Sequence, residues 1–287
     1  MHQNQISNSE ALWDKCLRAL AGVWAKQRLS VSASSLHQAN LAEYEVLLEQ
    51  SCCGVSVRQA WHMNWFISSY RFGAGGVLER SLAGGGGEDV ISLVDRRICL
   101  GNVILEDSGF LLGRYPEGLL QWLLMVSLGR VHDSLVWGRF LFEDRMGSAV
   151  DSDFTGLPLD EYCRLLWYSL NGLDHDFQLN EYSPYFGILR AWGKSGDLTS
   201  EFWRVMDLHL KDVTRLSSAE VFYLSPFNLC PVEVMAALQI LGDDVLERGV
   251  AGHPLYRNPV VSAVAASKCD TEDGLRLREW FESRSTD

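Results

Sequence analysis

The sequence predicts an all-α protein, and three observations support this. Apolar residues recur at spacings of three and four along most of the chain, as they do on one face of a helix. Period-two alternation bounded by hairpin dipeptides is missing. Gly, Pro and Asp separate the apolar segments at short intervals. We therefore expect a layered array of about a dozen antiparallel helices, paired as helical hairpins, without a substantial sheet.

The N-terminal third should contain four helices. Ser7 and Glu10 have the spacing of a capping box and precede an apolar stripe that begins at Leu12. Further helices are expected over residues 35–50, 55–72 and 77–82. The four consecutive glycines at 84–87 would lose too much backbone entropy in a helix or strand, so they predict a loop.

The remainder of the chain should be helical as well. Residues 88–105 include several β-branched residues that would also suit a strand, but their spacing favours a helix. Pro116 and Pro158 each suit the first turn of a helix, and the helix after Pro116 should pair with 133–146. Residues 147–157 are polar and small, which predicts a soft subdomain boundary within a single domain, 1–287. Other helices are expected at 184–192, 200–214, 218–224, 231–241, 259–267 and 271–284.

Charge and hydropathy exclude several classes of function. The chain has 25 Lys and Arg against 37 Asp and Glu, a formal net charge of −12. This charge repels nucleic acid and anionic membrane and attracts a basic partner. The N-terminus lacks the features of a secretory signal, and no stretch approaches the roughly 18 apolar residues of a membrane span. We therefore expect a cytoplasmic protein that binds neither nucleic acid nor membrane, with its oligomeric state left open.

The cysteines are expected to be buried apolar residues. Their number is odd, and no pair has C-x-x-C spacing, so neither a disulfide framework nor a zinc site is indicated. The seven are Cys16, Cys52, Cys53, Cys99, Cys163, Cys230 and Cys269.

Few motifs indicate catalysis. Residues 84–87 lack the strand, helix and G-K-[ST] context of a phosphate loop, and no G-x-S-x-G elbow occurs. Residues 243–247, Asp-Asp-Val-Leu-Glu, approximate the metal motif of terpene synthases without a second metal motif. His132-Asp133 resembles the metal-ligating pair of HD-domain phosphohydrolases. The alternative for that pair is a histidine at a helix C-terminus followed by an N-cap aspartate. We expect no catalytic residue, metal or cofactor.

Three acidic segments are candidate surfaces for a basic protein: 151–160, 174–181 and 243–247. Tyr182 and Tyr185, which follow the second segment, add aromatic side chains of the kind found in protein interfaces. The alternative for each segment is a solvated helix end. The candidate contacts are Asp151, Asp153, Asp174, Asp176, Glu181, Asp243, Asp244 and Glu247.

Residues 231–259 combine an apolar helix that begins with proline, an acidic break and a rigid His-Pro-Leu-Tyr turn. Pro231, Glu233, His253 and Pro254 in this segment resemble the C-terminal part of all-α immunity proteins of bacterial polymorphic toxin and contact-dependent secretion systems. The resemblance implies a cytoplasmic, non-catalytic protein that binds a cognate toxin, often a nuclease, and occludes its active site. A carboxylate array would imitate the nucleic-acid backbone.

The sequence thus predicts an antitoxin-like immunity protein that binds its partner through acidic surface loops. Two alternatives remain open at this point. One is a metal-dependent HD-type phosphohydrolase that uses His132 and Asp133, and the other is a helical scaffold or regulatory protein.

Overall fold

The computed structural model describes residues 2–33, 78–79, 81–85, 87–108, 115–144, 158–173, 181–193, 197–215 and 227–267. Within these ranges every regular element is helical, with ten α-helices, one π-helical turn and one 3-10 turn. The all-α prediction is confirmed. The helices expected over 35–50, 55–72, 218–224 and 271–284, and the boundary expected near 147–157, lie outside the described residues.

The chain divides into two compact units. Unit 1 comprises Met1–Cys16, Gly113–Tyr223 and Cys230–Arg257, and unit 2 comprises Leu17–Leu112, Leu224–Leu229 and Asn258–Asp287. Helix α1, His2–Ala33, contributes its first part to unit 1 and its remainder to unit 2. The other elements of unit 1 are α6 (Tyr115–Ser127), α7 (Val131–Arg139), the π-helical turn Phe140–Asp144, α8 (Pro158–Leu170), α9 (Phe186–Ala191), α10 (Thr199–Arg215), α11 (Val232–Leu241) and α12 (Asp244–Val250).

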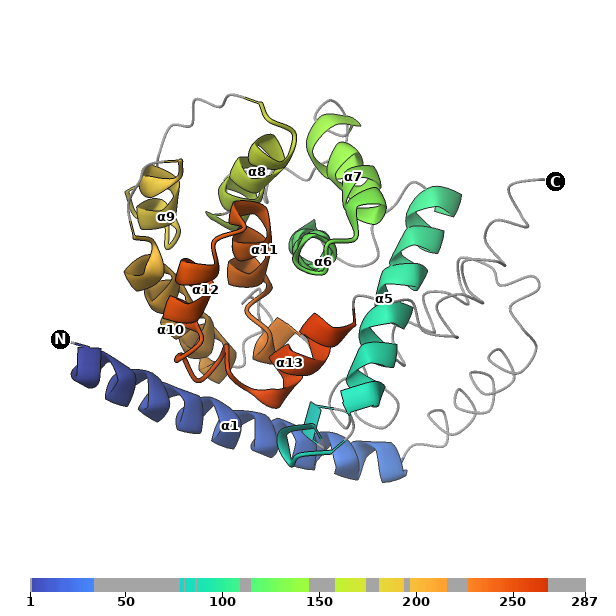
Figure 1. Cartoon of the computed structure of the whole chain (residues 1–287). Helices are drawn as coiled ribbons and strands as arrows, with labels where there is room; N and C mark the ends of the chain where they lie inside the picture. Colours follow the sequence, from blue (N-terminus) through green and yellow to red (C-terminus); the bar gives the residue numbers. More distant parts are fainter. Residues whose placement is uncertain are drawn as a thin grey trace. The chain divides into compact units, whose positions relative to one another are not determined.

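Helix α6 forms the centre of unit 1. Its residues from Pro116 to Ser127 are buried except Glu117. The helix is apolar on all sides, which is the pattern of a helix surrounded by others. It packs against α7, α8 and α11, and Figure 1 shows it along its axis with these helices around it.

Helix α11 is the second core element of unit 1, as the sequence predicts. Pro231 occupies the N-cap position, and the residues from Val232 to Leu238 are all buried. The helix ends at Gly242, whose φ of +60° lies in the left-handed region that glycine adopts without strain. Helix α11 packs against α6, α8 and α10. The acidic residues that follow Gly242 are thereby placed at the end of a buried helix.

Aromatic side chains fill the space beside α6. The rings of Trp122 and Phe142 meet edge to face with centroids 5.1 Å apart, and Trp167 lies 5.8 Å from Phe142. Helix α7 approaches this cluster at Gly138, where an added Cβ would lie 2.0 Å from a ring carbon of Trp167. Only a glycine permits this approach.

Unit 2 is described in part. It includes α5 (Gly87–Ser108), the 3-10 turn Phe227–Leu229 and α13 (Pro259–Ala266), and α13 packs against α5. The α5 segment is a helix despite its β-branched residues, as expected. The side chain of Asn258 caps α13 by accepting the N–H groups of Val260 and Val261.

Three local predictions are wrong. Helix α1 begins at His2, so Ser7 lies inside it and does not cap it; the preceding polar residues continue the helix. Gly87, expected in a loop, is the first residue of α5. His132 and Asp133 are both in the first turn of α7, whose N-cap is Arg130. Gly129, with φ +67°, ends α6 and allows α7 to begin at Val131, before Asp133 could act as a cap.

Candidate functional site

Four of the eight predicted contact residues, Asp151, Asp153, Asp174 and Asp176, lie outside the described residues. Glu181 is exposed, and the adjacent Tyr182 is 95% exposed. After these two residues the chain turns inward, since Ser183 and Tyr185 are both buried, and Oγ of Ser183 accepts the backbone N–H of Tyr185 at 3.2 Å. Glu181 and Tyr182 therefore project from the start of a segment whose next residues are anchored in the core.

The acidic residues after α11 have different roles. Oδ1 of Asp243 accepts the backbone N–H groups of Val245 at 2.9 Å and Leu246 at 3.0 Å, which caps α12. Asp244 and Glu247 are exposed on α12, and Val245 between them is 69% exposed. The hydroxyl of Tyr256 donates to Glu247 at 3.3 Å. Asp243 is thus a structural cap, whereas Asp244 and Glu247 present carboxylates beside an exposed apolar side chain.

The residues that follow Glu181 and Glu247 are hydrogen-bonded to the N-terminal half of α10. The indole N–H of Trp203 donates to the carbonyl oxygen of Gly249 in α12 at 3.0 Å. On the next residue, Nη2 of Arg204 donates to the carbonyl oxygen of Pro184 at 2.7 Å. The tertiary structure therefore attaches residues 181–184 and helix α12 to consecutive residues of one helix, although about sixty residues separate them in the sequence.

The structure adds an acidic residue that the sequence did not reveal. Asp197, exposed just before α10, accepts the backbone N–H of Thr199 at 2.9 Å, and this hydrogen bonding lowers the pKa of its carboxyl group. Thr199 in turn lies against Gly249 of α12, where an added Cβ would be 2.6 Å from the threonine Oγ1. The sequence pattern that could have identified Asp197 is an Asp-x-Thr spacing ahead of an apolar stripe, which is typical of a helix start.

The His132-Asp133 pair does not converge on one point. Neighbouring residues on a helix point about 100° apart. His132 is exposed, whereas Asp133 is largely buried with Oδ2 4.0 Å from Nη1 of Arg130. Among the described residues, no group of three or more His, Cys, Asp or Glu side chains is placed to hold a metal ion. No observation in this part of the chain favours the hydrolase alternative.

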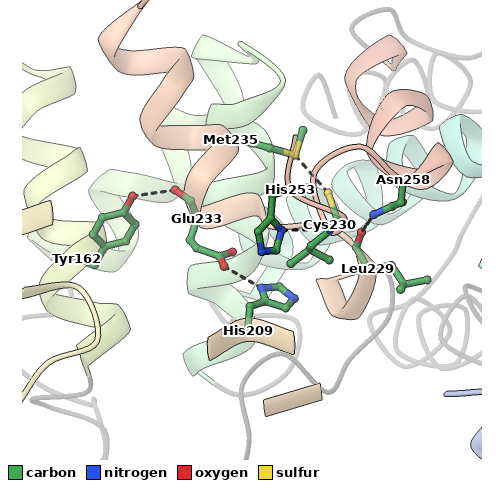
Figure 2. Close-up of polar contacts among 9 residues, drawn as sticks. Tyr162, His209, Leu229, Cys230, Glu233, Met235, His253 and Asn258 are labelled. Atoms are coloured by element: carbon green, nitrogen blue, oxygen red, sulfur yellow. Dashed lines mark hydrogen bonds and ion pairs between the residues drawn. The ribbon is translucent and has the colours of Figure 1, made fainter. Parts of the chain in front are cut away.

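A buried ion-pair geometry lies between α10 and α11, and the sequence did not predict it. Nδ1 of His209 lies 2.8 Å from Oε1 of Glu233, and both side chains have no exposed surface (Figure 2). The second carboxylate oxygen of Glu233 has no hydrogen-bond partner among the described residues. The sequence features that could have indicated this pair are a single carboxylate in the apolar run of α11 and a histidine on the apolar stripe of α10.

Tyrosines complete the surroundings of Glu233. The hydroxyl of Tyr162 on α8 donates to the backbone carbonyl of Glu233 at 2.8 Å, as Figure 2 shows. The ring of Tyr185 stacks on that of Tyr162 with centroids 4.4 Å apart. Burial holds the pKa of both tyrosines well above the ordinary value, and the nearby charge of Glu233 is the second cause. Both phenols therefore remain protonated and serve as packing and hydrogen-bonding groups.

A second polar cluster contains Ser, Asp and His side chains, but it does not have the geometry of a catalytic triad. Oγ of Ser9 donates to Asp207 at 2.7 Å, and Nε2 of His253 lies 3.3 Å from the same carboxylate oxygen. In a triad the histidine, not the aspartate, contacts the serine. Ser9 is also fully buried. This cluster holds elements together and offers no accessible nucleophile.

Three of the cysteines confirm the expectation of buried thiols. Cys16, Cys163 and Cys230 are free and fully buried, and burial raises the pKa of each. The burial of the other four lies outside what the structure describes.

The four residues that carry the family resemblance, Pro231, Glu233, His253 and Pro254, are all buried, and His253-Pro254 forms a turn as expected. Comparisons of the chain with family models, curated proteins and solved structures return no match. None of the described helices has the length and apolar character needed to cross a membrane.

Proposed function

We propose that the protein is a non-catalytic, antitoxin-like immunity protein of the bacterial cytoplasm, which binds a basic toxin and occludes its active site. The supporting observation is the arrangement around the start of α10, where Glu181, Asp197, Asp244 and Glu247 are exposed on adjoining segments. The net charge of −12 adds a long-range attraction for a basic partner.

The chemistry of these segments suits recognition of a protein. Interfaces combine buried apolar or aromatic side chains with a polar rim. Val245 is 69% exposed and lies between Asp244 and Glu247, and Tyr182 is 95% exposed beside Glu181. A basic partner that buries Val245 would bring its Lys and Arg side chains against the flanking carboxylates. Asp151, Asp153, Asp174 and Asp176 remain further candidate contacts on the evidence of the sequence alone.

Immunity proteins protect the cell that makes their toxin, so the test starts from the adjacent gene. The protein encoded beside this chain is expressed in a bacterial host with and without it. We expect growth arrest by the neighbour alone, restoration of growth on co-expression, and a complex that can be purified. A neighbour that is harmless and forms no complex would overturn the proposal.

Two matched charge reversals then test the surface. Asp244→Lys and Glu88→Lys change the same charge on an exposed first-turn acid, in α12 and α5 respectively. At low salt, Asp244→Lys should weaken the complex by about five- to tenfold and Glu88→Lys should not. The difference should shrink as ionic strength rises. Equal affinities of the two variants would remove α12 from the interface.

A further inference from the structure

Two hydrogen bonds hold the ring of His253 in one tautomer. The backbone N–H of Leu255 donates to Nδ1 at 3.2 Å, so Nδ1 presents a lone pair and carries no proton. Nε2 therefore carries the proton and donates it to Oδ1 of Asp207 at 3.3 Å. The neutral imidazole thus satisfies both nitrogens, one toward its own turn and one toward α10. The side chain of His253 is fully buried, and Figure 2 draws its ring together with Glu233 and His209.

The same carboxylate and the same turn hold the first part of α1. Oδ1 of Asp207 also accepts a hydrogen bond from Oγ of Ser9 at 2.7 Å. The backbone N–H of Arg257 donates to the carbonyl oxygen of His253 at 3.0 Å, and the Arg257 side chain pairs with Glu10. The side-chain links from residues 9 and 10 of α1 therefore both end on residues that are hydrogen-bonded to His253.

Protonation of His253 is incompatible with this geometry. A second proton on Nδ1 would point at the N–H of Leu255, so that two donors would face each other across 3.2 Å. The imidazolium can keep its contact with Asp207 only if the ring or the turn moves. In the part of the chain that the structure describes, the titratable and charged groups around the ring are Asp207 and His209 on α10, Glu10 on α1 and Arg257 in the same turn.

We propose that His253 is an acid-sensitive latch for the first part of α1, residues 2–16, and that its protonation releases this segment from α10 and from the turn 253–257. The proposal concerns regulation of the fold and does not rest on the proposed partner.

The direction of the effect follows from the surroundings of the ring. Burial lowers the pKa of His253 below its ordinary value, and Asp207 offsets the shift only in part. The histidine is therefore neutral at neutral pH and the latch is closed. It opens as the pH falls below the ordinary histidine pKa of about 6.5. The ring of Trp203 packs edge to face with the imidazole, with the two ring centroids 4.9 Å apart. It carries no charge, so it does not oppose protonation of His253 by charge repulsion.

Hydrogen exchange of the full chain, read by peptide mass spectrometry at about pH 7.5 and about pH 5.5, tests the proposal. After correction for the intrinsic pH dependence, peptides within residues 2–16 should lose up to about tenfold in protection, because pH 5.5 lies about one unit below the ordinary histidine pKa of about 6.5. Peptides of the central helix α6 should not. His253→Gln cannot take up a proton and should abolish the loss, whereas His132→Gln, at an exposed histidine of α7, should leave it unchanged. Equal protection at both pH values, or the same loss in His253→Gln, would overturn the latch.

A second variant covers the case in which His253→Gln does not fold. Asp207→Asn keeps an oxygen acceptor for Ser9 and His253 but removes the charge that favours the imidazolium. The midpoint of release should therefore move to lower pH. The readout is the labelling of Cys16, which is fully buried at the end of the released segment, by an aromatic disulfide reagent. A midpoint that stays in place or rises would contradict the mechanism.

Discussion

The buried pair of His209 and Glu233 allows the sharpest test of the interior. Removing one member of a buried pair leaves the other charged and desolvated, which typically costs about 3–5 kcal/mol. Replacing both by apolar residues of similar volume is often close to neutral, because neither desolvation penalty then remains. Oε2 of Glu233 already has no hydrogen-bond partner among the described residues, so little else would compensate the carboxylate once His209 is gone.

The perturbation is a double-mutant cycle with His209→Leu, Glu233→Leu and the double variant. We expect His209→Leu to lower the free energy of unfolding by about 3–5 kcal/mol. Glu233→Leu leaves the buried Nδ1 of His209 without its contact to the carboxylate and should cost about 1–3 kcal/mol. The double variant should lie within about 2 kcal/mol of the natural protein, so the two single effects exceed the double effect by several kcal/mol.

Guanidinium unfolding followed by tryptophan fluorescence and far-UV circular dichroism measures these differences. The midpoints are compared at unchanged slope, because a changed slope would report a different unfolded state or a loss of cooperativity. Additivity of the two single changes to within about 0.5 kcal/mol would show that the pair is not energetically coupled. That result would refute the interpretation that His209 and Glu233, which are fully buried with Nδ1 and Oε1 2.8 Å apart, form a coupled pair.

Three further changes have definite expected outcomes. Gly138→Ala should destabilise the fold by about 1–3 kcal/mol, because the added methyl group would overpack against the indole of Trp167. Gly22→Ala, at a helical position with open space around it, should stabilise the fold by up to about 1 kcal/mol. Thermal unfolding that ranks the two variants in the opposite order would contradict the packing at Gly138. Asp243→Ala should cost about 1 kcal/mol through loss of the α12 cap, and denaturant midpoints that do not move would show that the cap is dispensable. Because the folded-state pKa of His253 is depressed, the unfolded chain takes up the proton first. Stability should therefore be full above the ordinary histidine pKa of about 6.5 and decline below it, and His253→Gln should flatten that part of a melting-temperature profile against pH.

The helices that the sequence predicted best are those whose pattern is unambiguous. Helix α11 follows directly from Pro231, an apolar run and a terminating Gly242. Helix α6 follows from an apolar run too continuous to face solvent. The helix starts were less predictable. Ser7 has the side chain and spacing of a capping residue but lies within α1, because the helix begins at His2.

Among the candidate contacts, local sequence did not separate binding residues from structural ones. Asp243, Asp244 and Glu247 look alike in the sequence, yet only Asp243 has its carboxylate taken up by backbone N–H groups. That distinction depends on where Gly242 ends the preceding helix and hence on which residue becomes the cap.

By itself, the sequence determined that the fold is all-α, that the formal net charge is −12, and that residues 231–241 form a core helix. These properties are summed or periodic along the chain, so they need no knowledge of distant contacts. Only the tertiary structure decided that residues 181–184 and α12 adjoin on α10, that His209 meets Glu233, and that Ser9, Asp207 and His253 share one carboxylate oxygen. Such juxtapositions join residues tens to hundreds of positions apart, and they are fixed by the packing of whole helices, which no local pattern encodes.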